Sequence, residues 1–204
     1  MVEENGGALP KKKSIKLAAQ NFIAAAAETE AYVAAARQQL SDAQVSRVYD
    51  GAVISLYRDF ENLILEVLVG AINNDTTTIS DTLGVSFPRH LTDAVCRYMI
   101  TGPSYFDFKG RDGLIKRVKQ YVPANHYLLP VLRDQKYKVP LERLCTLRNL
   151  AAHGSPQSKK AALEAVGQKR IGSAGSWLKC QGRFSLLIGK LRQLAQDIDA
   201  VAPY

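Results

Sequence analysis

The sequence predicts an all-α protein, a helical bundle built around a long antiparallel pair of helices. Hydrophobic residues recur at steps of three or four over long stretches, which is the period of a buried helix face. No segment alternates as a strand does, and Pro, Gly and Ser mark the ends of the helical stretches. With 204 residues, of which 47% are hydrophobic, the chain is long and apolar enough to form one domain with a hydrophobic core. We expect that domain over residues 14–204, after a flexible N-terminal tail over residues 1–13.

The first two predicted helices form the long pair. Residues 14–40 are rich in alanine and read as one helix, and Ser41 with Gln44 makes a capping-box pattern that opens a second. The hydrophobic residues of this second helix are Val45, Val48, Tyr49, Ala52, Val53, Leu56, Phe60, Leu63, Ile64, Val67 and Leu68. They form one broad stripe that has to be buried against other helices. The tight turn at Ser41 makes the two helices antiparallel neighbours.

Shorter helices are predicted along the rest of the chain. They run from Pro88 to Gly102, around residues 114–121, from Pro140 to Gly154, from Pro156 to Val166 and from Phe184 to Val201. Residues 73–87 are rich in Thr, Asp and Asn and predict a loop. The prolines between residues 123 and 140 predict an irregular connection, and the glycines of residues 172–176 predict a flexible link.

The basic charge of the chain is concentrated in one segment. The formal net charge is +8, and residues 109–160 hold twelve basic and three acidic residues. Lys and Arg that neutralise phosphates supply the sequence-independent part of nucleic-acid affinity. The segment therefore suits an anionic polymer such as a nucleic acid, and Lys116, Arg117 and Lys119 are the expected RNA-binding residues. The alternative interpretation is a solvated basic face.

The number and spacing of the cysteines and the hydropathy of the chain indicate the cellular compartment. Cys96, Cys145 and Cys180 are odd in number and form no C-x-x-C pair, which argues against a disulfide framework or a zinc site and favours a reducing compartment. The N-terminal residues do not resemble a secretory signal, and no apolar run approaches the ~20 residues of a membrane span. We expect a cytoplasmic protein with no membrane partner, no metal and no cofactor.

The candidate catalytic residues lie where the helix from Pro140 ends. Arg148, Asn149 and His153 fall within about one and a half helical turns. A guanidinium stabilises charge on a phosphate, an amide orients it, and an imidazole transfers protons near neutral pH. These residue types suit cleavage of a phosphodiester without a metal. The alternative is structural, because Arg148 and His153 can also cap the carbonyl groups at helix ends.

The run from Leu147 to Gly154 resembles the HEPN superfamily of helical ribonucleases, whose signature is an Arg, a polar residue that is commonly Asn, a few residues and a His. The run from Tyr57 to Glu61, in a long early helix, is similar to HEPN proteins of the RiboL-PSP type. The resemblance implies a homodimer in which both motifs face one cleft. It also implies that RNA is cut without a metal by its own ribose 2′-hydroxyl, which leaves a 2′,3′-cyclic phosphate and a 5′-hydroxyl.

Within that resemblance each motif residue has an expected role. His153 would transfer the proton, Arg148 would stabilise the extra charge on phosphorus, and Asn149 would orient the phosphate or the imidazole. Glu61 is the candidate supporting acid, with Asp59 as its neighbour on the same helix.

The resemblance further implies a toxin or an anti-phage defence effector, with an antitoxin or defence protein as partner. Some toxins of the superfamily carry, two residues after the His, a Tyr that the antitoxin adenylylates. This chain has Ser155 there, which puts that route of silencing in doubt. The alternative function, from another class, is a non-catalytic RNA-binding or protein-interaction module that uses the same basic surface.

Overall fold

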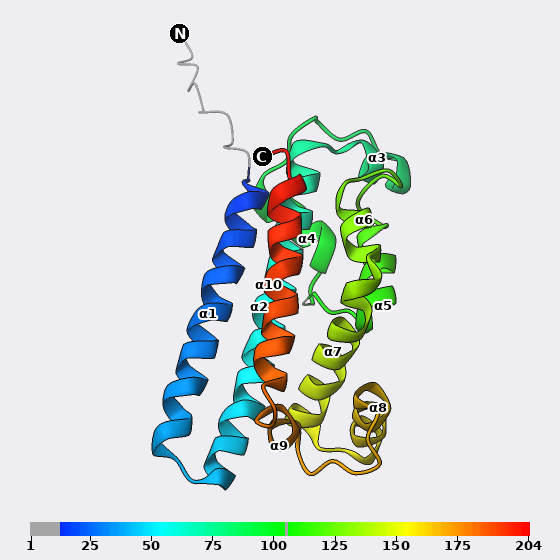
Figure 1. Ribbon diagram of the computed structural model, residues 1–204. Helices are drawn as coiled ribbons and strands as arrows, with labels where there is room; N and C mark the ends of the chain where they lie inside the picture. Colours follow the sequence, from blue (N-terminus) through cyan, green and yellow to red (C-terminus); the bar gives the residue numbers. More distant parts are fainter. Residues whose placement is uncertain (1–12, 105) are drawn as a thin grey trace.

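The computed structural model describes residues 13–104 and 106–204, and its regular elements are all helical (Figure 1). They are α1 (Ile15–Gln39), α2 (Asp42–Asn74), α3 (Thr77–Leu83), α4 (Asp93–Thr101), α5 (Gly110–Val118), α6 (Leu128–Arg133), the 3₁₀ turn η1 (Gln135–Tyr137), α7 (Lys138–His153), α8 (Pro156–Val166), α9 (Ala174–Leu178) and α10 (Arg183–Val201). The predicted all-α class is confirmed for the described part of the chain.

The long pair predicted from the sequence is present as α1 and α2, which pack along each other. The chain reverses at Leu40 and Ser41, and the Ser41 backbone N–H donates to Gln44 Oε1 at 3.0 Å as half of a capping box. Helix α10 also packs along α1, and in Figure 1 it lies in front of α2. The last helix of the described bundle therefore packs against the first.

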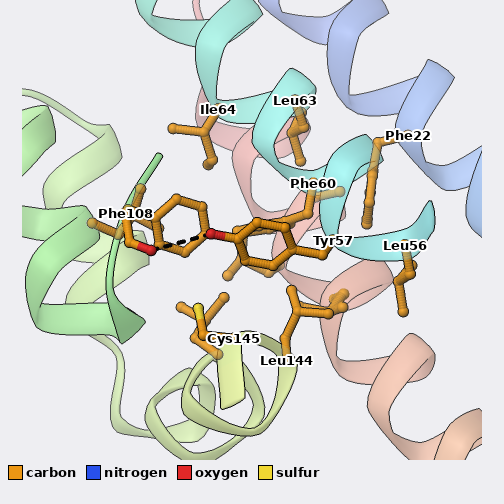
Figure 2. Packing of buried hydrophobic residues seen from close by; sticks show 14 of the residues in the cluster. Phe22, Leu56, Tyr57, Phe60, Leu63, Ile64, Phe108, Leu144 and Cys145 are labelled. Carbon is orange, nitrogen blue, oxygen red and sulfur yellow. Dashed lines mark hydrogen bonds between the residues drawn. The ribbon is translucent and has the colours of Figure 1, made fainter. Parts of the chain in front are cut away.

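Helix α2 is the centre of the fold because it contacts α1, α4, α7 and α9. Its predicted stripe is buried, with Leu56, Phe60 and Ile64 fully enclosed. Figure 2 shows Phe22 of α1 and Leu144 of α7 converging on this stripe from different sides. The rings of Phe22 and Phe60 meet edge to face with 5.7 Å between centroids. The stripe therefore fixes where α7 lies relative to α2.

Three predicted boundaries were wrong. The loop predicted over residues 73–87 contains α3, and the connection predicted between residues 123 and 140 contains α6 and η1. Pro130 and Pro140 each occupy the third position of their helix, where the backbone N–H has no intrahelical partner to lose. Helix α4 begins at Asp93 and not at Pro88, because the Thr92 side chain caps it by accepting the N–H of Val95 at 3.4 Å.

The flexible link predicted over residues 172–176 is also wrong, because its last three residues are the start of α9. Ser173 caps it in a capping box, and the Gly175 N–H donates to Asp50 Oδ1 of α2 at 2.6 Å. A Cβ at Gly175 would lie 1.8 Å from the carbonyl oxygen of Ser46. Gly175 therefore allows α9 to pack closely on α2, and it does not make the segment flexible.

Lys13, the last residue of the predicted tail, is anchored to the bundle. Its ammonium forms ion pairs with Glu66 and with Asp93, the latter at 3.2 Å, and its backbone N–H donates to Asn73 Oδ1 at 3.2 Å. Residues 1–12 of that tail lie outside the described residues. The anchored Lys13 joins the start of α1 to α2 and α4.

Candidate active site

Helix α7 carries Arg148, Asn149 and His153 along its last two turns. The helix is held by a row of buried leucines, Leu141, Leu144, Leu147 and Leu150. Gly154 ends it in the left-handed conformation, with φ of 58°, and donates its N–H to the carbonyl of Leu150 at 3.0 Å. His153 is therefore the last helical residue, and it is exposed.

The three residues do not all face the same way on α7. Asn149 and His153 are four residues apart, which places them on one face about 40° apart. Arg148 is five residues before His153 and lies about 140° around the helix from it. The guanidinium accordingly reaches toward α2, and the imidazole stands at the exposed end of α7.

Four side chains surround the Arg148 guanidinium. Its Nη1 donates to Asn149 Oδ1 at 2.9 Å. Its Nη2 lies 3.5 Å from Asp107 Oδ1 and 3.9 Å from Glu61 Oε1, and its Cζ lies 3.9 Å from the centroid of the Tyr57 ring. The side chain is only 21% exposed. The position of the positive charge is thus fixed by two carboxylates, one amide and one aromatic face.

Tyr57 of α2 ties the segment before α5 to this group. Its hydroxyl lies 2.9 Å from Asp107 Oδ1 and 3.1 Å from the Phe108 carbonyl oxygen, and the second contact is drawn in Figure 2. The Phe108 ring stacks on the Tyr57 ring with 5.5 Å between centroids. Burial raises the pKa of Tyr57 far above its usual range, so its hydroxyl stays protonated and donates. Tyr57 therefore holds Asp107 beside Arg148.

Glu61 is the second carboxylate of the group, one turn along α2 from Tyr57. Burial is the main cause that raises its pKa to about 7; nearby Arg148 lowers the pKa, and Asp107 raises it. Glu61 Oε1 and Arg148 Nε are buried and have no hydrogen-bond partner among the described residues. Native proteins contain few such atoms, and each of them calls for an explanation.

A cavity of about 630 Å³ opens beside this group. Its walls include Tyr57, Asp107, Arg148, Asn149 and His153. The elements that contribute are α2, the segment before α5, the start of α5, α7 and α8. A volume of this size accommodates a nucleotide-sized ligand. The predicted motif therefore lines an open cavity, and Arg148 is not sealed inside the core.

The two acidic candidates on α2 separate in the structure. Glu61 approaches Arg148, whereas Asp59 pairs with Arg58 at 3.2 Å and lines a different cavity, between α1, α2 and α4. Sequence reasoning missed Asp107, which has no helical pattern around it. The only signal was its position between Phe106 and Phe108, two aromatic residues able to anchor a loop to a core.

The residues predicted to bind RNA do not line this cavity. Lys116 and Lys119 are exposed at the far end of α5, about 10 Å or more along the axis from the Lys109 end that does line it. Arg117 is engaged elsewhere, since its Nη2 donates to the Ile100 carbonyl at 2.5 Å and its Nη1 to Gln120 Oε1 at 3.0 Å. The structure thus brings together the motif and Glu61, but not the three basic residues.

Within residues 13–104 and 106–204 no group of three or more His, Cys, Asp or Glu is placed to hold a metal ion. In the same ranges no helix is both long and apolar enough to span a membrane. No protein-family model, curated protein or solved structure matches the chain. Any function assigned to the cavity therefore has to be argued from the residues that line it.

Proposed function

We propose that this chain is a metal-independent endoribonuclease of HEPN type, with Arg148, Asn149 and His153 as its catalytic residues. One observation carries the proposal. A guanidinium fixed by Tyr57 and Glu61 lines the same open cavity as an exposed imidazole. Fixed positive charge and a group that transfers protons both contribute to phosphodiester cleavage by an internal nucleophile.

In this proposal the ribose 2′-hydroxyl attacks the adjacent phosphorus. His153 takes the proton of the 2′-hydroxyl and returns it to the leaving 5′-oxygen, and Arg148 stabilises the charge that develops on the phosphoryl oxygens. The bond to the 5′-oxygen of the next nucleotide breaks, which leaves a 2′,3′-cyclic phosphate and a 5′-hydroxyl. Asn149 accepts a hydrogen bond from Arg148 through its Oδ1, and its amide N–H groups would orient the phosphate.

Glu61 acts in this proposal as a positioning residue. Its carboxyl restrains the guanidinium without a direct hydrogen bond, at 3.9 Å. With a pKa raised to about 7, it is partly protonated at neutral pH and competes less with a phosphate for Arg148 than an ordinary carboxylate would. The site would then hold Arg148 in place and still leave its charge available to RNA.

The resemblance to the superfamily extends the proposal to a homodimer with a composite site. Support comes from the exposed end of α7, where His153 stands about 140° around the helix from Arg148. A second copy facing this end would add a second imidazole to the cavity. A toxin or anti-phage defence role, with an antitoxin or defence protein as partner, belongs to the same proposal.

The test is incubation of the purified chain with a mixed RNA pool in EDTA, followed by analysis of the product ends. The proposal predicts cyclic-phosphate ends from the wild type and none from His153→Ala or Arg148→Ala. Arg47→Ala, which removes an exposed arginine of α2 outside this cavity, is the matched control and should cut as the wild type does. Equal cleavage by His153→Ala and the wild type would refute the assignment.

The second candidate function is a non-catalytic RNA-binding module. The exposed Lys116 and Lys119, outside the cavity, favour it. A module of this kind would bind RNA with an affinity that falls steeply with salt, and would leave the RNA intact. Intact RNA in the assay, together with weaker binding by Lys116→Ala and Lys119→Ala, would establish it.

A further inference from the structure

A second cavity, of about 510 Å³, lies between α7, the end of α8, α9 and α10. Its lining includes Arg143, Trp177, Arg183 and Lys190, and none of the residues that line it also lines the Arg148 cavity. Pro140 and Arg143 contribute from a different side of α7 than Asn149 does. The two cavities are therefore independent places on the molecule.

Two guanidinium groups lie on one indole ring in this cavity. Arg183 Cζ is 4.7 Å and Arg143 Cζ 5.6 Å from the centroid of the Trp177 ring. Arg183 is fixed by the Trp177 carbonyl at 3.2 Å and by Gln181 Oε1 at 2.8 Å, and Arg143 Nε donates to the Ala165 carbonyl at 3.2 Å. Neutral acceptors thus hold both cations in place without cancelling their charge.

The positive charge of this cavity is not neutralised as it is around Arg148. In the described part of the chain no Asp or Glu lines the cavity, and Arg143, Arg183 and Lys190 form no ion pair. The remaining cation, Lys136, is paired with Asp134 at 3.2 Å and Asp197 at 2.8 Å. Like charges held close together repel one another, and a bound anion relieves that repulsion.

The other walls of the cavity are apolar. Val166, Leu186 and Leu187 line it beside Trp177, and Leu186 is 69% exposed at its rim. A flat aromatic ring fits such a wall, because indole rings and guanidinium planes both stack on nucleobases. Lys190 and the remaining guanidinium N–H groups of the two arginines suit a phosphate. An acidic peptide would use the cations but not the stacking surface.

We infer that this cavity binds a nucleoside phosphate, with the base against the Trp177 and arginine stack and the phosphate beside Lys190. Such a ligand can come from two sources, because single-stranded RNA and a free mononucleotide carry the same base and phosphate groups. The inference does not depend on cleavage at the Arg148 cavity. If the chain cuts RNA, this second site holds the strand at a distance from the bond that breaks.

The experiment uses the fluorescence of Trp177, the only tryptophan in the chain. The wild type is titrated separately with a short 2′-O-methyl oligoribonucleotide, with AMP, with inorganic phosphate and with an acidic peptide. The oligonucleotide lacks the 2′-hydroxyl and cannot be cut by the proposed mechanism, so binding is measured apart from cleavage. Saturable quenching by the oligonucleotide alone identifies a strand site, and comparable quenching by AMP identifies a free-nucleotide site.

Lys190→Glu is the principal variant, because Lys190 is exposed on α10 and its replacement leaves the core intact. We expect it to raise the dissociation constant obtained from the quenching titration about tenfold or more, because one charge-assisted contact is lost and the new carboxylate repels the phosphate. Lys160→Glu, an exposed lysine of α8 outside the cavity, is the matched control and should bind as the wild type does. Arg183→Gln should weaken binding in the same direction.

Three results would overturn the inference. They are the absence of saturable quenching by oligonucleotide and AMP, equal binding by Lys190→Glu and Lys160→Glu, and quenching by the acidic peptide with none by nucleotides. His153→Ala should bind the oligonucleotide at this site as the wild type does. If His153→Ala no longer cuts RNA but still shows the quenching, both proposals are supported. If the wild type shows the quenching but cuts no RNA, only the ribonuclease proposal is refuted.

Discussion

The Arg148 guanidinium lies over the ring of Tyr57, with 3.9 Å between Cζ and the ring centroid. The Tyr57 hydroxyl, at the other end of the same side chain, contacts Asp107, whose carboxylate is 3.5 Å from Arg148 Nη2. One tyrosine of α2 therefore sets both the face on which the cation rests and the position of a carboxylate beside it.

Tyr57→Phe should destabilise the chain by about 1–2 kcal/mol, since it leaves the buried Phe108 carbonyl without its hydroxyl partner. Denaturant unfolding of the variant and the wild type measures the change. Tyr98→Phe is the matched control, because Tyr98 is 67% exposed and its hydroxyl loss should change stability little. Equal stability of Tyr57→Phe and the wild type would show that the hydroxyl contacts contribute nothing.

Glu61 should make the stability of the chain fall as pH rises from about 4.5 through about 7. Its pKa in the folded state is raised to about 7 from a usual value of 4.5, so in this window the folded state holds the proton that the unfolded state has released. Glu61→Gln removes this titration. The stability of the variant relative to the wild type should therefore increase across the window and become level above it, measured by denaturant unfolding at a series of pH values.

The pKa of Glu61 should respond in opposite directions to its two charged neighbours. Arg148→Ala removes a cation that lowers this pKa and should raise it, whereas Asp107→Asn removes an anion that raises it and should lower it. Carboxyl carbon NMR of Glu61 over a pH titration reads the shift directly. Shifts of the same sign in the two variants would contradict the arrangement described for this group.

Gly175→Ala should destabilise the chain by about 2 kcal/mol or more, because the new Cβ would overlap the Ser46 carbonyl and force α9 away from α2. Gly189→Ala is the control. It adds the same methyl group to an exposed site of α10 with no atom within 4 Å, and should stabilise the helix by about 0.5–1 kcal/mol. Thermal unfolding of both variants gives the comparison, and similar melting temperatures would argue against tight α9 packing.

The candidate site was only partly predictable from the sequence. Arg148, Asn149 and His153 share one helix and a short spacing, so their proximity follows from local geometry. Asp107 belongs to an irregular segment 41 residues before Arg148, and no periodicity leads to it. Its place beside Arg148 results from the contacts of Tyr57 and Phe108, which join segments far apart in the chain.

The sequence by itself determined the all-α class, the long α1 and α2 pair and the end of α7 at Gly154. These features depend on local signals, which are a 3.6-residue hydrophobic period, a capping box and a glycine that adopts a positive φ. The tertiary structure alone decided that Glu61 and not Asp59 faces Arg148, that Arg117 is used in packing, and that Gly175 serves contact with α2. Each of these depends on which helix faces which, and that is set by burial of side chains from distant segments, a property that no short window of sequence contains.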